Sequence, residues 1–135
     1  MGYRIDKPRV FLGGTCNSST WREELIPMLE IGYFNPVVED WNESARVEEI
    51  LQRQECDYLL YVITSEMAGV YSIAEVVDDS NKRPEKTLLC VLLGGFTEGQ
   101  IKSLDAVMDM VRNNGGTIFY TLEGVAEWLN IRGRI

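Results

Sequence analysis

The chain has 135 residues, of which 21 are acidic and 13 are basic, and its net charge at neutral pH is -8. This charge argues against binding of a nucleic-acid polymer, because phosphate contacts need clustered Lys and Arg, and the basic residues here are scattered. The absence of histidine excludes nucleophiles activated by histidine and metal sites that use it. Any acid, base or nucleophile must therefore be a carboxylate, Tyr, Lys, Cys or Ser.

The three cysteines, Cys16, Cys56 and Cys90, are odd in number and widely spaced. This pattern indicates neither a disulfide framework nor a zinc site, and we expect reduced thiols and a cytoplasmic location. The polar N-terminus lacks the apolar core of a signal peptide, and no apolar run approaches the length of a membrane span. The length suits a single domain over residues 1–135.

The first predicted element is a short strand over residues 9–12 that ends at Gly13 and Gly14. Small, hydroxyl-rich residues follow from 15 to 20, and a helix is predicted over residues 21–29. A turn of this kind before a helix N-terminus can hold a sugar or a phosphate with backbone amides and hydroxyls. It can equally be a tight turn that needs glycine for a positive φ, and the sequence leaves both interpretations open.

Residues 33–38 predict the second strand, and a polar loop follows over residues 39–44. Trp41 in this loop could stack on a nucleic base, while Asp40 hydrogen-bonds the hydroxyls of a sugar. The simpler alternative is that Trp41 covers the hydrophobic core and that Asp40 is a solvated acid.

The next helix, over residues 45–55, is predicted by apolar residues that recur at helical spacing, namely Val47, Ile50 and Leu51. Glu49 precedes Arg53 by four residues on this helix. Such a pair is typical of an exposed ion pair, which is the simplest interpretation of Glu49.

Residues 58–63 form a continuous apolar run, which predicts a central strand covered on both sides. A polar turn and Gly69 follow, and a helix is predicted to open at Ser72. Glu75 would then lie in the first turn of this helix, just beyond the carboxyl end of a buried strand, where open α/β sheets bind ligands. The spacing of Ser72 and Glu75 also fits a capping box, as does the sequence of residues 20–23. Glu75 is therefore either a capping group or a catalytic carboxylate.

The remaining chain predicts strands over residues 87–93 and 117–120 and helices over residues 101–111 and 122–129. The sequence thus alternates five strands with five helices. This alternation predicts an α/β fold with a five-stranded parallel sheet, helices on both faces, and most simply the flavodoxin-like or Rossmann-like strand order 2-1-3-4-5.

Several short motifs, taken in order and spacing, resemble the nucleoside 2-deoxyribosyltransferase family, particularly its short 2-deoxyribosyltransferase-like branch. The similarity spans roughly residues 9–95. The motifs are VFLGGT at 10–15, STWR at 19–22, FNPVV at 34–38 leading to Asp40-Trp41, CDY at 56–58, and GVYSIAE at 69–75.

This resemblance implies an enzyme that cleaves the N-glycosidic bond of a (deoxy)nucleoside or nucleotide and transfers the sugar to another base or to water. Glu75 matches the glutamate that attacks the anomeric carbon, as in a retaining glycosidase. Glu49 matches an acid that assists the leaving base, and Asp40 is the rival candidate for that role. No cofactor and no metal are implied.

The resemblance also implies a nucleoside pocket and a neighbouring subunit that completes it, so we expect a homo-oligomer with shared active sites and look for the donated residue in residues 97–103. Gly69 holds the place where better-studied members carry Asp or Ser, which weakens the expected contact to the 5′ side of the sugar. The expected substrate-binding residues are Gly13, Gly14, Thr15, Asn17, Trp41, Gly69 and Tyr71.

Two alternatives remain open. The fold class, the acidic surface and the hydroxyl-rich loop after the first strand suit a flavodoxin-like FMN-binding electron carrier, which absorption at about 450 nm would reveal. A non-catalytic nucleotide-binding module would keep the pocket without turnover. Substitution of Glu75 separates this module from the enzyme.

Overall fold

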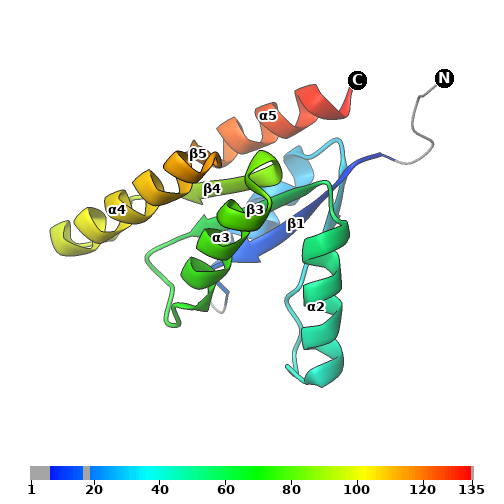
Figure 1. The fold of residues 1–135 in the computed structure, drawn as a ribbon, viewed down its shortest axis with the longest axis horizontal. Helices are drawn as coiled ribbons and strands as arrows, with labels where there is room; N and C mark the ends of the chain where they lie inside the picture. The colour runs from blue at the N-terminus through cyan, green and yellow to red at the C-terminus, as the bar shows by residue number, and fades with distance from the viewer. Residues whose placement is uncertain (1–6, 17–18, 135) are drawn as a thin grey trace.

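The computed structural model describes residues 7–16 and 19–134 and contains a five-stranded parallel sheet (Figure 1). The strands are β1 (Arg9–Gly14), β2 (Gly32–Phe34), β3 (Tyr58–Ile63), β4 (Thr87–Val91) and β5 (Thr117–Phe119). They follow the order β2-β1-β3-β4-β5, and each neighbouring pair is parallel. The predicted α/β fold and its strand order are therefore confirmed.

The helices follow the strands in alternation, as the sequence predicts. They are α1 (Trp21–Leu25), α2 (Glu43–Glu55), α3 (Tyr71–Lys82), α4 (Glu98–Asn114) and α5 (Leu122–Gly133). Short 3-10 helices, η1 (Ile26–Met28) and η2 (Pro84–Lys86), continue the chain after α1 and α3.

Successive side chains of each strand point to opposite faces of the sheet and enter two hydrophobic clusters. On one face, Leu12 of β1 lies in a cluster with residues of α1 and α5. On the other face, Phe11 of β1 lies in a cluster with residues of α3 and α4. Strands β3 and β4 contribute to both clusters, which explains why their sequences are apolar without interruption.

The first helix and the second strand are shorter than predicted, and proline accounts for both differences. Helix α1 ends at Leu25 because Pro27 has no amide hydrogen with which to continue an α-helix. Its predicted capping box is also wrong, since the Thr20 side chain makes no capping hydrogen bond. Strand β2 ends at Phe34, and Pro36 follows two residues later, where it cannot donate to a sheet ladder.

Helix α2 lies to one side of the layered part of the molecule and buries none of its residues (Figure 1). The apolar spacing that predicted this helix therefore does not mark a buried face of the described chain. Val47, Ile50 and Leu51 are 54%, 41% and 44% exposed.

The strand order reverses beside β1, because β2 lies on one side of it and β3 on the other. In open α/β sheets, the carboxyl ends of the strands at such a reversal are the usual place for a ligand. Within the described ranges, no helix is both long enough and apolar enough to cross a membrane.

Candidate active site

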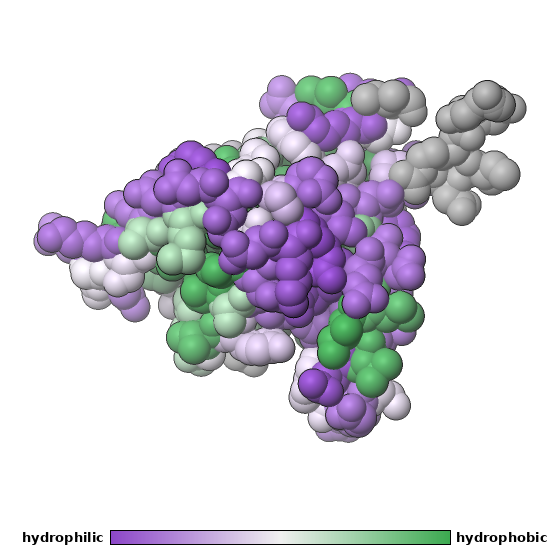
Figure 2. Space-filling model, in the orientation of Figure 1, coloured by the Kyte–Doolittle hydropathy of each residue, from purple (hydrophilic) through white to green (hydrophobic). Residues whose placement is uncertain are grey.

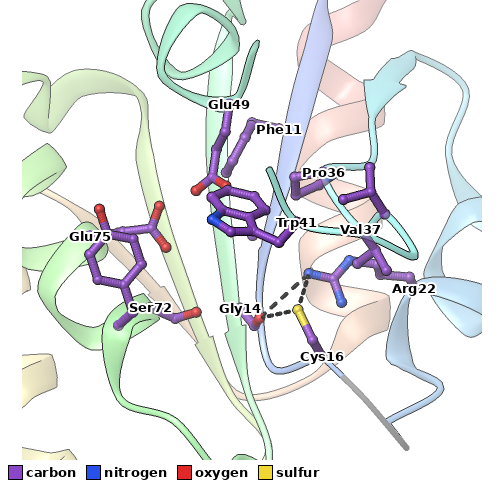
Figure 3. A pocket seen from close by; sticks show the side chains of 13 residues that line it. Phe11, Gly14, Cys16, Arg22, Pro36, Val37, Trp41, Glu49, Ser72 and Glu75 are labelled. Carbon is purple, nitrogen blue, oxygen red and sulfur yellow. Dashed lines mark hydrogen bonds between the residues drawn. The ribbon is translucent and has the colours of Figure 1, made fainter. Parts of the chain in front are cut away.

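A pocket of about 410 Å³ opens at the carboxyl end of β1, within the size range of small-molecule sites (Figure 3). It combines the end of β1, the loop after β2, helix α2 and the start of α3. Its lining residues are Phe11, Gly13, Gly14, Cys16, Arg22, Pro36, Val37, Val38, Trp41, Glu49, Tyr71, Ser72 and Glu75. The structure therefore brings six of the predicted site residues together: Gly13, Gly14, Trp41, Glu49, Tyr71 and Glu75.

The two glycines at the end of β1 are required by close packing. Gly14 has a φ of +117°, and a Cβ atom there would lie 2.1 Å from the backbone oxygen of Val62. A Cβ atom on Gly13 would lie 2.7 Å from ring carbons of Tyr61. The interpretation of a tight turn is therefore correct, and it is compatible with a ligand because the same glycines leave this wall of the pocket without side chains.

Arg22 of α1 fixes the turn after β1 from inside. Its guanidinium donates to the carbonyl oxygens of Leu12 at 2.9 and 3.0 Å and of Thr15 at 2.8 Å. Arg22 is buried, and this burial lowers its pKa below the ordinary value. Most of the guanidinium N–H groups already donate to backbone carbonyl oxygens. Arg22 therefore mainly holds the turn in place, although it also lines part of the pocket.

Glu75 is not a capping residue. Helix α3 begins at Tyr71 with Val70 as its N-cap, and no side chain caps it, so the predicted capping box of Ser72 and Glu75 is wrong. The earlier start moves Glu75 from the first turn into the second. Its side chain is only 7% exposed, yet it reaches the pocket.

The Glu75 carboxyl has one oxygen without a hydrogen-bond donor. Oε2 of Glu75 is buried and unpartnered, and within the described part of the chain no other buried side-chain oxygen or nitrogen lacks a partner. The nearest cation, Nη1 of Arg53, lies 3.7 Å away, which is an ion-pair distance but too long for a hydrogen bond. An unpartnered buried oxygen on a residue that lines a pocket calls for a functional explanation.

Glu49 of α2 and Glu75 of α3 both line the pocket, and their carboxyl groups lie near each other (Figure 3). Burial is the main reason that the pKa of Glu75 rises to about 9, and hydrogen bonding and repulsion from Glu49 raise it further. Arg53 opposes this rise. Glu75 therefore keeps a proton at neutral pH beside a second carboxyl group in the same pocket.

Aromatic and apolar side chains form the other walls. Trp41 is 55% exposed and Tyr71 is 67% exposed, although both line the pocket. Trp41 therefore does not cover the core, which removes the simpler interpretation of this residue. Flat, accessible rings at the mouth of a pocket can stack on a planar base.

Some predicted site residues lie elsewhere. Asp40 is exposed and does not line the pocket. Thr15 and Gly69 line a smaller adjoining cavity of about 190 Å³. The Thr15 hydroxyl accepts from the amide of Thr64 at 2.9 Å, so it also holds β1 to β3. Asn17 lies outside the residues that the structure describes.

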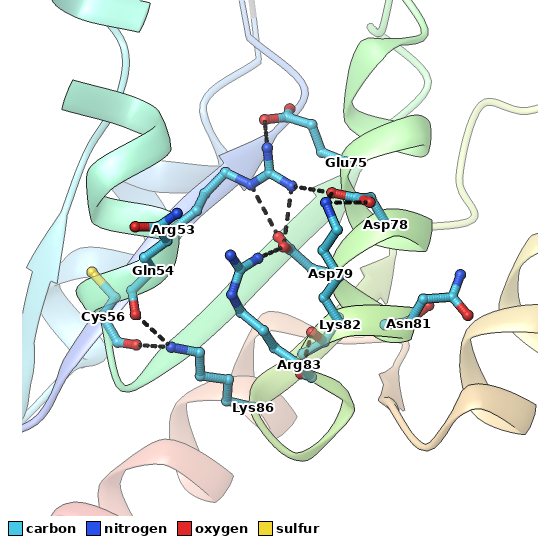
Figure 4. A network of polar contacts seen from close by, with 12 residues as sticks. Arg53, Gln54, Cys56, Glu75, Asp78, Asp79, Asn81, Lys82, Arg83 and Lys86 are labelled. Carbon is cyan, nitrogen blue, oxygen red and sulfur yellow. Dashed lines mark hydrogen bonds and ion pairs between the residues drawn. The ribbon is translucent and has the colours of Figure 1, made fainter. Parts of the chain in front are cut away.

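The predicted ion pair of Glu49 and Arg53 is replaced by contacts between helices. Arg53 hydrogen-bonds Asp79 and Asp78 of α3 (Figure 4). Sequence reasoning did not include Arg53 or Asp79 in the site. The signal for them was their spacing, because each lies four residues after a pocket glutamate, on the same helix face.

Metal ligation finds no support in the described ranges. Between residues 7 and 134, with 17 and 18 left aside, no group of three or more Cys, Asp or Glu side chains could hold a metal ion. The pocket carboxyls Glu49 and Glu75 are two ligands at most.

Comparison with protein families matches residues 7–94 to the family described as nucleoside 2-deoxyribosyltransferase like, which is well over half of the chain. The matched segment contains β1 to β4 and all residues that line the pocket. No curated protein sequence matches the chain. The family match supports glycosyl transfer in general and small nucleoside substrates. The chain belongs to the nucleoside 2-deoxyribosyltransferase-like family.

Proposed function

We propose that the protein cleaves the N-glycosidic bond of a (deoxy)nucleoside or nucleotide, with Glu75 as the nucleophile and Glu49 as the acid and base. One observation carries this proposal: Glu75, which has a buried oxygen without a hydrogen-bond donor, lines a pocket that also holds a second carboxyl group. An oxygen without a donor keeps its lone pairs available for an electrophilic carbon.

In the first step, the Glu75 carboxylate attacks C1′ of the sugar and forms an ester bond. The C1′–N bond breaks, its electron pair moves to the base nitrogen, and the Glu49 carboxyl supplies the proton that neutralises the departing base. Stacking on Trp41 and Tyr71 would hold the base in line with the bond that breaks.

In the second step, the Glu49 carboxylate removes a proton from water or from the nitrogen of a second base. The activated group attacks C1′, and the ester bond to Glu75 breaks with its electron pair returning to the carboxylate. Two displacements at one carbon retain its configuration. Water gives hydrolysis, and a second base gives transfer.

The raised pKa of Glu75 keeps a proton in the pocket, and transfer of this proton to the neighbouring Glu49 would suit the sequence of steps. Attack requires an ionised Glu75, and departure of the base requires a protonated neighbour. Positive charge that develops at C1′ in the transition state favours an ionised Glu75. The reaction itself therefore favours the arrangement in which Glu75 is the anion and Glu49 carries the proton.

The test is incubation with a panel of nucleosides, deoxynucleosides and their 5′-monophosphates, with and without free adenine, followed by chromatography. We expect free base from at least one substrate, and new nucleosides if transfer occurs. Glu75→Ala should abolish base release and Glu49→Gln should reduce it by about 100-fold or more. Glu48→Gln is the matched control, because Glu48 is an exposed neighbour on α2 outside the pocket.

Intact-mass measurement provides a second readout of the nucleophile. A slow substrate should add the mass of one sugar to the wild-type protein and nothing to Glu75→Ala. If no substrate on the panel is cleaved, the enzyme proposal is wrong, and a non-catalytic nucleotide-binding module takes its place. If Glu75→Ala releases base as fast as the wild type, Glu75 is not the nucleophile.

We also propose that the protein forms a homo-oligomer whose interface borders the pocket. The support is an apolar area on and beside α2, called here the α2 patch, whose members are 41% to 55% exposed; hydrophobic surface over α2 is visible in Figure 2. Its residues are Val37, Val38, Trp41, Val47, Ile50 and Leu51. Three of them also line the pocket, so a partner on this patch would border the substrate.

A further inference from the structure

Arg53 is the residue through which α2 reaches α3 (Figure 4). Its Nε and Nη2 atoms donate to the two carboxyl oxygens of Asp79, each at 3.1 Å. Nη2 also donates to Asp78 at 3.2 Å. This fork leaves Nη1 as the nitrogen that faces Glu75, at 3.7 Å from Oε2.

Asp79 is held rigidly behind Arg53. Its side chain is fully buried, and its oxygens also accept hydrogen bonds from the Tyr61 hydroxyl of β3 and from Arg83. A carboxylate with this many charged and neutral donors cannot turn toward another partner without leaving them unsatisfied. Asp79 therefore fixes the plane and the position of the Arg53 guanidinium.

The position of the guanidinium decides what Glu75 can do. At 3.7 Å, Arg53 attracts the negative charge of Glu75 without occupying its Oε2 lone pairs. A closer approach of Arg53 would form a hydrogen-bonded ion pair with Oε2. Removal of the Arg53 cation would leave the negative charge of Glu75 next to Glu49 and Asp79 without this positive charge to stabilise it. The charged and titratable groups that face Glu75 are Glu49 and Arg53 of α2, Asp79 of its own helix and Tyr61 of β3.

We propose that Asp79 and Arg53 act as a positioning pair, in which Asp79 holds Arg53 at a distance from Glu75 that stabilises a negative charge on Glu75 without a hydrogen bond to its Oε2. This inference rests on the proposed function for its catalytic meaning. Its electrostatic content concerns the free protein and can be tested without a substrate.

The first test is a titration of Glu75 in the free protein by carbon NMR of labelled glutamate carboxyls, assigned with Glu75→Gln. In Arg53→Met the cation is lost, and the midpoint should rise by about one pH unit or more. In Asp79→Asn a like charge is lost and Arg53 can close on Glu75, so the midpoint should fall by about one pH unit or more. Arg53→Lys, which keeps the charge, should return the midpoint toward the wild-type value.

The second test is the rate of base release as a function of pH. Titration alone would make Asp79→Asn faster at neutral pH, because more Glu75 is ionised. The positioning role predicts the opposite, a plateau rate that falls about tenfold, because a hydrogen bond from Arg53 to Oε2 makes the Glu75 carboxylate a weaker nucleophile.

The matched controls come from the exposed pair of Asp109 and Arg112 on α4, which lies outside the pocket. Asp109→Asn and Arg112→Met repeat the same chemical changes and should move neither the midpoint nor the rate. If Asp79→Asn does not fold, Tyr61→Phe loosens Asp79 with no change in charge and should lower the plateau rate in the same direction.

Shifts of the Glu75 midpoint in the same direction in Arg53→Met and Asp79→Asn, or no shift in either, would overturn the inference. So would a faster plateau in Asp79→Asn. If the wild-type protein cleaves no nucleoside, the proposed function fails on its own, and the opposed NMR shifts still decide whether Asp79 and Arg53 set the charge of Glu75.

Discussion

Glu75 is held where its charged form is costly, and this cost belongs to the folded state alone. Burial and the Glu49 carboxyl raise the pKa of Glu75 to about 9, whereas the ordinary value for the side chain is 4.5. Between these two pH values, the folded protein keeps a proton that the unfolded chain has released. The free energy of unfolding must therefore fall as the pH rises through this window.

Glu75→Gln should remove that dependence. A neutral amide of similar shape has no proton to lose, so the variant should gain stability relative to the wild type as the pH increases from about 5 to about 9, reaching a few kcal/mol. Urea unfolding at several pH values measures the difference. Glu48→Gln should show no such trend, because Glu48 is exposed. A constant difference between Glu75→Gln and the wild type would contradict the raised pKa.

Gly14 should be the least replaceable glycine at the pocket. Its φ of +117° is unfavourable for other residues, and a Cβ atom would lie 2.1 Å from the Val62 oxygen. We expect Gly14→Ala to lower the free energy of unfolding by more than about 2 kcal/mol. Gly94→Ala is the control, because its Cβ atom would meet nothing within 4 Å. Equal stability of the two variants in chemical denaturation would show that the turn can rearrange.

The central strands were predictable because a strand that is buried on both faces has an uninterrupted apolar sequence. Residues 58–63 are apolar without interruption, and β3 occupies the same six residues. Helix starts were less predictable, because a capping box is a local pattern that competes with tertiary contacts. The chain enters α3 at Tyr71, and this shift of one residue frees Glu75 from its backbone.

The place of Glu49 in the pocket could be predicted only through the family resemblance. Their spacing alone predicts an ion pair of Glu49 with Arg53. It does not reveal that Arg53 pairs instead with the fully buried Asp79 of α3. Helical spacing likewise grouped Val47, Ile50 and Leu51 on one helix without revealing that the helix buries none of its residues. Periodicity identifies residues that share a face but not what that face contacts.

Helix α2 carries Glu49 but has little packing of its own, so its N-cap should matter for catalysis. Asn42 accepts from the Ala45 amide at 2.9 Å. Loss of such a cap costs about 1 kcal/mol, and here this cost should appear as local fraying of α2. We expect Asn42→Ala to reduce base release severalfold and to speed amide hydrogen exchange in α2, with little change in global stability.

Thr121→Ala provides the matched control for Asn42→Ala. Thr121 is the N-cap of α5, accepts from the Gly124 amide at 3.0 Å, and lies outside the pocket. Because α5 packs on the sheet through Val125 and Leu129, its cap should affect global unfolding and leave base release unchanged. Equal losses of activity in the two variants would show that α2 has no special link to the chemistry.

The charge of the whole chain should influence which substrate it accepts. The net charge is -8, the pocket carboxyls are Glu49 and Glu75, and Arg22 is largely occupied by backbone carbonyls. A 5′-phosphate therefore approaches a negative surface. We expect kcat/KM for a neutral deoxynucleoside to exceed that for its 5′-monophosphate by about tenfold at low salt, with a smaller ratio at high salt. Preference for the monophosphate would show that the site supplies a phosphate contact that outweighs this repulsion.

The α2 patch should be covered by another copy of the chain in solution. A helix that buries none of its residues gains little from the fold, and its apolar side chains stay in water unless a partner covers them. We expect the wild-type protein to sediment as a dimer or a larger oligomer and Leu51→Glu to shift it toward the monomer. Ile131→Glu is the control, because Ile131 is 50% exposed on α5 and belongs to no part of the patch.

Assembly and activity should then be linked through the pocket, because Val37, Val38 and Trp41 belong to both the patch and the pocket wall. Dilution below the dissociation constant of the oligomer should lower the specific activity of the wild type, and Leu51→Glu should show the low value at every concentration. A monomeric wild type with activity proportional to its concentration would mean that one chain builds the whole site. In that case α2 would be kept in place by the contact of Arg53 with Asp79, and the apolar patch would have some other partner.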